Sequence, residues 1–107
     1  MDKDAVKQFS FLVWTYKMGE QVALMIHLGD RLGFYRAMTG AGPISSEELA
    51  AATGTDERFV REWLLGQAAA KLLDRTPDGR FELTDVQASV LADEDESLTF
   101  AAGAFRG

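Results

Sequence analysis

Few residues in this sequence have the type and spacing that catalysis or metal binding requires. The chain contains one histidine, His27, and no cysteine, which excludes a thiolate nucleophile and a zinc site built from several His and Cys ligands. A lone histidine inside an apolar stretch, here LMIHLG, is more often a packing residue than a general base, and both interpretations stay open. Ser45 and Ser46 have no histidine near them in the sequence, and helix capping explains them.

Two further segments resemble ligand loops only superficially. Residues 39–43, TGAGP, are rich in glycine, but they follow an expected helix rather than a strand, and Pro43 stands where a phosphate-binding helix would begin. The acidic run at 93–97, DEDES, lacks the alternating ligands and the central glycine of a calcium loop. The sequence therefore predicts no catalytic residue, no cofactor-binding residue and no metal ligand in this chain.

The charge of the chain argues against nucleic acid as a partner. The net charge is −6, and residues 45–84 hold five basic and eight acidic residues. Such a surface repels a phosphate backbone unless a basic patch is set apart from the acids. No apolar run is long enough to cross a bilayer and no secretory signal opens the sequence, so we expect a soluble cytoplasmic protein.

Two helices rich in apolar residues are expected first, over residues 4–18 and 20–38. Helical spacing gives the first helix two stripes, one of Phe9, Leu12, Val13 and Tyr16, and one of Phe11, Trp14 and Met18. The second helix carries a stripe of Val22, Met25, Ile26, Gly29 and Leu32. Helices that are apolar on most of their circumference must be covered on more than one side. Burial in the core and burial against a second subunit both stay open, because a chain of this length has little interior.

The next segment has the signals of a helix-turn-helix. Ser45 with Glu48 predicts a capping box that opens a helix ending near Gly54, and a second helix is expected from a cap at Thr55 to about residue 70. Strand-like alternation flanks the two-residue turn signal Asp78-Gly79, which predicts a hairpin.

A second capping box, Thr84 with Gln87, predicts a short helix after the hairpin. The order helix, turn, helix, hairpin defines a fold that is mainly α with a small β-hairpin, a winged helix-turn-helix preceded by two long apolar helices. We expect N-terminal dimerisation helices over residues 1–43, a winged-helix domain over 44–92, and an acidic link with the start of a truncated helix over 93–107.

The second helix of this motif would be the one that reads DNA, so its outer face decides between two functions. That face is expected to carry two arginines, each with a carboxylate four residues away, and two apolar residues, namely Glu57, Arg58, Arg61, Glu62, Leu65 and Ala69. Because these carboxylates neutralise the positive charge that would attract DNA phosphates, we expect this domain to serve as a packing module that contacts protein rather than DNA. The alternative is a winged-helix transcription regulator that contacts DNA through Arg58, Arg61 and Arg80.

Three segments in one order resemble the N-terminal region of bacterial S-adenosylmethionine-dependent class I methyltransferases: LGDRLGFYRAM, ELAAATGTDERFVREWLLGQAAAKLLDR and GRFELTDVQASVLADED. The resemblance covers about residues 20–98. It implies a domain that mediates homodimer contacts and forms a lid over a substrate pocket, while a separate Rossmann-like domain, supplied in cis or in trans, binds S-adenosylmethionine. It also implies that this chain alone binds no cofactor and is inactive.

The resemblance implies roles for the apolar residues of the first two helices. Candidates to contact substrate are Phe11, Trp14, Tyr16 and Met18, with dimer packing as the alternative for each. Candidates for the dimer interface are Phe9, Leu12, Val13, Val22, Met25 and Ile26.

Overall fold

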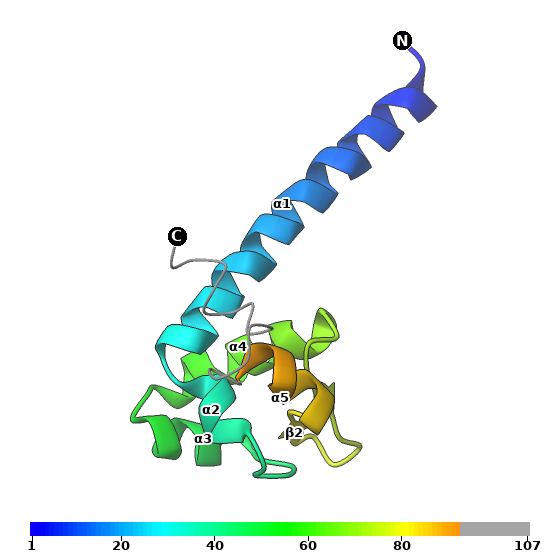
Figure 1. Cartoon of the computed structure of the whole chain (residues 1–107). Helices are drawn as coiled ribbons and strands as arrows, with labels where there is room; N and C mark the ends of the chain where they lie inside the picture. Colours follow the sequence, from blue (N-terminus) through cyan, green and yellow to red (C-terminus); the bar gives the residue numbers. More distant parts are fainter. Residues whose placement is uncertain (93–107) are drawn as a thin grey trace.

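The computed structural model describes residues 1–92, and one long helix dominates it (Figure 1). Helix α1 spans Lys3–Arg31, 29 residues, and begins at Asp2, whose carboxylate accepts hydrogen bonds from the backbone amides of the first turn. Its first two-thirds project away from the rest of the fold. The expected link and truncated helix at 93–107 lie outside the described residues.

The expectation of two long helices is wrong in one respect, because residues 3–31 form a single helix without a break near Gly19. A glycine in a helix interior costs about 1 kcal/mol, which is too little to end a helix that lacks a competing cap or proline. The break occurs instead at Gly33, whose φ of 79° ends α1 and opens the short helix α2, Phe34–Met38. Left-handed backbone of this kind favours glycine.

The helix-turn-helix forms as expected, with one shift. Helix α3, Ser46–Thr53, begins with the capping box of Ser45 and Glu48 and ends at Gly54 in left-handed conformation. Helix α4, Glu57–Ala69, is capped by Asp56 rather than by Thr55. The amide of Thr55 donates to the carbonyl of Ala50 at 3.0 Å and so still belongs to the end of α3.

The wing is a two-stranded antiparallel hairpin of β1, Asp74–Arg75, and β2, Phe81–Glu82. Its loop has three residues, 77–79, rather than two, because the amide of Thr76 donates to the carbonyl of Arg80 at 2.8 Å while Gly79 takes a φ of 84°. A bridge between Ile44 and Phe81 ties the start of the winged helix to the wing. Helix α5, Asp85–Leu91, follows with the expected capping box at its start.

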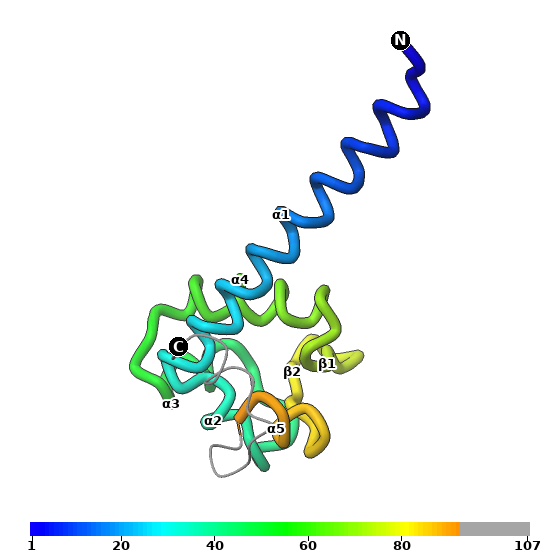
Figure 2. The backbone as a smooth tube through the Cα atoms, turned by 45° about the horizontal axis from the view of Figure 1, so that its top comes forward, coloured from blue at the N-terminus to red at the C-terminus, as the bar shows by residue number. Residues whose placement is uncertain are grey.

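Among the described residues, the buried apolar side chains that form the core all lie within residues 34–91. Its largest fully buried side chains include Tyr35, Phe34, Met38, Leu49 and Leu64. Trp63 packs edge-on against Phe34 and Tyr35, with ring centroids 4.8 Å and 5.2 Å away. Figure 2 shows α1 crossing α4 before it leaves the domain. Within residues 1–92 no helix is both long enough and apolar enough to cross a membrane.

The buried hydroxyl of Tyr35 makes the stability of this core depend on alkaline pH. It donates a hydrogen bond to the side-chain oxygen of Gln67, and burial, with Asp30 adding to it, raises the pKa of Tyr35 well above its ordinary value of 10.0. Because the folded state holds the proton more tightly than the unfolded chain, this contribution to stability is complete below pH 10 and is lost as the pH rises above it.

We therefore expect the free energy of unfolding to fall steeply above pH 10, and Tyr35→Phe to flatten that fall. At neutral pH the same substitution should cost about 0.5–1.5 kcal/mol, because it removes the bond to Gln67. Urea titrations between pH 7 and 11 measure both effects, with the exposed Tyr16→Phe as control. Equal alkaline slopes for Tyr35→Phe and the unmodified chain would contradict this account.

Candidate functional site

The crossing of α1 and α4 is built on a glycine. A β-carbon at Gly29 would stand 2.4 Å from Cζ2 of Trp63 and 2.8 Å from Cε2 of Tyr35. The indole nitrogen of Trp63 donates to the carbonyl of Met25 at 2.8 Å, which fixes the ring against α1. Glycine at position 29 therefore lets the two helices approach closely and sets the angle at which α1 leaves the domain.

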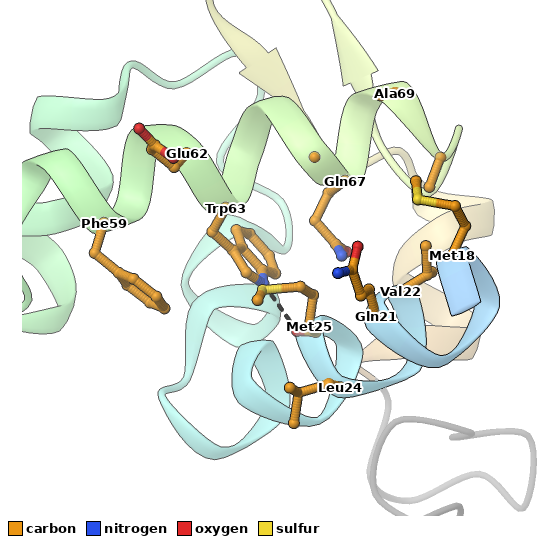
Figure 3. A pocket seen from close by; sticks show the side chains of 12 residues that line it. Met18, Gln21, Val22, Leu24, Met25, Phe59, Glu62, Trp63, Gln67 and Ala69 are labelled. Atoms are coloured by element: carbon orange, nitrogen blue, oxygen red, sulfur yellow. Dashed lines mark hydrogen bonds between the residues drawn. The ribbon is translucent and has the colours of Figure 1, made fainter. Parts of the chain in front are cut away.

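Beyond this crossing the two helices diverge and leave a groove of about 620 Å³. From α1 it is lined by Met18, Gln21, Val22, Leu24 and Met25, and from α4 and its C-terminal cap by Phe59, Glu62, Trp63, Gly66, Gln67, Ala69 and Ala70. Figure 3 shows the groove running from Phe59 and Glu62 at one end to Met18 and Ala69 at the other. A volume of this size can hold one drug-sized ligand or a few apolar side chains.

The chemistry of the groove is that of a binding surface. Among the described residues that line it, Gln21, Glu62 and Gln67 carry polar side-chain groups besides the indole N–H of Trp63, which is bonded to Met25. The side-chain oxygen of Gln67 already accepts a hydrogen bond from the hydroxyl of Tyr35. His27 lies in the last third of α1 but is not part of the lining. No group of three potential metal ligands occurs within residues 1–92. The lining can therefore accept apolar side chains or rings, and it contains no acid–base pair.

The projecting part of α1 is an apolar surface without a cover in the described chain. Phe9 is 66% exposed, Trp14 58% and Tyr16 70%, and Phe11 is exposed to a similar degree. An aromatic side chain carries about 150–250 Å² of surface, so these four leave on the order of 400 Å² uncovered. This surface is divided between two faces of α1, with Phe11 and Trp14 on one and Phe9 and Tyr16 on the other, and exposed apolar surface on this scale marks interaction sites.

The continuity of α1 joins candidates that the sequence placed on separate helices. Spacings of three and four residues place Phe11, Trp14 and Met18 on the same face as Val22 and Met25, and we call these five residues the α1 stripe. Its last three members line the groove. The opposite face carries the other candidates, Phe9, Leu12, Val13 and Tyr16. Ile26, proposed for a dimer interface, packs partly buried against the core of its own chain.

The sequence did not identify the part of the groove that α4 supplies. Glu62 and Ala69 were expected on the outer face of this helix, but Trp63, Gly66 and Gln67 were not predicted as site residues. A glycine inside an amphipathic helix, beside a tryptophan, is the one signal that could have indicated a close or open packing site.

The surface that would read DNA is only partly neutralised as expected. Arg61 pairs with Glu57 at 3.8 Å, but the expected pair of Arg58 and Glu62 does not form within 4.0 Å. Glu62 lines the groove beside α1 instead. Arg58 is exposed on α4.

The wing offers no free cation for phosphate among the residues that the sequence suggested. Arg80 pairs with Asp78 at 3.0 Å, and hydrogen bonds from Thr76 and Arg80 lower the pKa of Asp78. Arg75 lies over the ring of Phe81, 5.9 Å from its centroid. Both cations of the wing are therefore engaged locally.

S-adenosylmethionine does not fit the residues that the structure describes. A Rossmann-type site needs a parallel strand followed by a glycine-rich loop at a helix start. Here the strands are two residues long and antiparallel, and the glycines with positive φ stand at helix ends and in turns.

Helix α1, the helix-turn-helix of α3 and α4, and the wing together define a winged-helix protein. The family of Rv2258c-like winged HTH domains matches residues 20–93, more than half of the chain, and the chain belongs to that family. None of the curated proteins matches the chain in sequence.

Solved methyltransferases contain a domain of the same shape. The mitomycin 7-O-methyltransferase MmcR is 27% identical with a TM-score of 0.74, and the match covers 84% of this chain and 26% of that one. CalO1, a methyltransferase in calicheamicin biosynthesis solved in an SAH-bound form, is 33% identical with a TM-score of 0.68, over 87% of this chain and 26% of that one. RosA from Streptomyces davawensis, an N,N-8-amino-8-demethyl-D-riboflavin dimethyltransferase, is 26% identical with a TM-score of 0.67, over 78% and 24%. The chain spans about a quarter of the length of these enzymes.

Proposed function

We propose that this chain is the dimerisation and substrate-lid domain of an S-adenosylmethionine-dependent methyltransferase whose catalytic domain is supplied in cis or in trans. The observation that carries the proposal is the uncovered apolar surface of α1, which a second protein surface must shield. The similarity to MmcR, CalO1 and RosA supports the choice of enzyme class. The two faces of α1 would serve different purposes, one against a second copy and one toward substrate.

Because the proposal assigns the cofactor site to a separate catalytic domain, it predicts that this chain alone does not bind S-adenosylmethionine. Isothermal titration of the 107-residue chain with the cofactor should give no binding heat at micromolar concentrations. A control titration should use a complete methyltransferase such as CalO1, which was solved with SAH bound. Saturable micromolar binding to this chain would refute the assignment of the cofactor site to another domain.

The alternative is a DNA-binding regulator, and the observation in its favour is that Arg58, exposed on α4, forms no ion pair within residues 1–92. We expect it to fail, because Arg61 and Arg80 are ion-paired and the chain is acidic. In gel shifts at low salt, the chain should bind duplex DNA no better than the nonspecific range of about 10⁻⁴–10⁻⁶ M. Binding below micromolar that weakens with salt and is reduced by Arg58→Ala would establish the regulator instead.

A further inference from the structure

The α1 stripe continues past the end of its own domain. Met25 packs partly buried beside Trp63, and Met18 and Val22 line the groove. Phe11 and Trp14 extend beyond it, where their ring centroids lie 6.5 Å apart and both side chains remain exposed. The surface formed by the α1 stripe therefore has an apolar groove at its C-terminal end and exposed aromatic side chains at its N-terminal end.

We propose that two copies pair their α1 helices antiparallel, so that Phe11 and Trp14 of one protomer fill the α1–α4 groove of the other. This inference rests on the proposed dimerisation function and specifies its partner and register. The proposed occupant is a second copy of this chain. A two-fold axis places the stripe of each protomer against the groove of the other, so that both contacts form at once.

The spacing of the stripe fixes the register. Its positions 11, 14, 18, 22 and 25 are symmetric about Met18, with steps of three, four, four and three residues. An axis through Met18 places Phe11 opposite the partner's Met25, Trp14 opposite the partner's Val22, and Met18 opposite its own symmetry mate. Phe11 and Trp14, at the N-terminal end of each stripe, then lie against the groove of the other chain.

Charge is complementary in the same arrangement. Lys7 lies on the face of the stripe, four residues before Phe11, and is carried toward the end of the groove where Phe59 and Glu62 lie. Glu62 is the one charged residue among the described residues that line the groove. An antiparallel pairing brings this lysine toward the partner's Glu62, whereas a parallel pairing would leave both residues far apart.

The area available is compatible with a weak to moderate dimer. Because both stripes and both grooves are covered at once, the apolar surface removed from water is on the order of 1,000 Å². Specific stable interfaces bury about 1,200–2,000 Å² in total. The side-chain volume of two aromatic rings also suits a groove of about 620 Å³.

Cross-linking of single-cysteine variants of the 107-residue chain tests the register. No other thiol can react, since the natural sequence has no cysteine. Met18→Cys should be captured as a dimer by a short thiol cross-linker that reaches across neighbouring helices, about 8–10 Å apart. Asp4→Cys, on the same face of α1, should not be cross-linked. In the proposed register the two substituted positions of the dimer would lie about 42 Å apart, at a helical rise of about 1.5 Å per residue. Capture of both variants would establish a parallel pair and overturn the proposal.

A second variant tests whether the partner's side chains occupy the groove. At Gly66 a β-carbon would meet no atom within 4 Å, so Gly66→Leu keeps the fold and fills the groove. We expect it to weaken dimerisation at least tenfold in sedimentation equilibrium, whereas Arg58→Leu, exposed on the same helix, leaves it unchanged. Unaltered association of Gly66→Leu would place the second helix outside the groove. A dimer that fails these tests overturns the register alone, while a monomer overturns the dimerisation function as well.

Discussion

Trp14→Asp should convert the chain from a dimer to a monomer at a concentration of tens of micromolar while leaving its fold intact. Trp14 stands in the middle of the exposed half of the α1 stripe, and tryptophan is among the residues that dominate interface energetics. Replacing a buried anchor of this kind costs 2 kcal/mol or more, and a buried carboxylate without a partner adds to the loss. We expect the dissociation constant to rise on the order of 100-fold, since about 1.4 kcal/mol corresponds to a factor of ten.

Light scattering during size-exclusion chromatography, over a range of loading concentrations, measures this change. The matched control is Tyr16→Asp, which places the same charge on the opposite face of α1 and should leave the association unchanged. Both variants should keep the thermal transition of the monomeric core, because neither side chain belongs to it. Dissociation by Tyr16→Asp but not by Trp14→Asp would assign the interface to the other face.

Gly29→Ala should destabilise the core at the crossing of α1 and α4. The added methyl would overlap ring atoms of Trp63 and Tyr35 at 2.4 Å and 2.8 Å, and neither ring can withdraw easily. Trp63 is held by its bond to Met25, and Tyr35 by its bond to Gln67. Overpacking of a close-packed interior costs about 1–3 kcal/mol, and contacts of 2.4 Å and 2.8 Å place this substitution in the upper part of that range, so that the cost exceeds the gain of about 1 kcal/mol in helix propensity by about 1 kcal/mol or more.

A loss of this size should lower the melting temperature by at least about 4 °C, measured by circular dichroism at a concentration where the chain is monomeric. Gly19→Ala is the control, because a β-carbon there meets no atom within 4 Å and the residue lies in the exposed part of the same helix. An equal or higher melting temperature for Gly29→Ala would mean that α1 does not cross α4 at this residue.

The local signals of the winged helix could be predicted because they act over a few residues. The capping boxes at Ser45 and Thr84 and the left-handed Gly54 each satisfy backbone groups within one turn. The errors occurred where neighbouring residues compete for the same backbone group. Thr55 was expected to cap α4, but its amide is already bonded to α3.

The candidate site was only half predictable. The apolar character of α1 follows directly from residues such as Phe11 and Trp14, but their relation to Met25 depends on whether the helix continues through Gly19. That question is decided by a balance of about 1 kcal/mol, which residue types alone do not resolve. The groove itself depends on the contact of Gly29 with Trp63, residues far apart in the sequence, which no local pattern indicates.

Sedimentation equilibrium of the unmodified 107-residue chain tests most directly whether the uncovered surface of α1 is an interface with a second copy. The account predicts a reversible monomer–dimer equilibrium, with the dimer predominant at tens of micromolar and only modestly weakened by salt, because the contact is mainly apolar and Lys7 and Glu62 contribute charge only at its ends. A single monomeric species that persists to several hundred micromolar would contradict it.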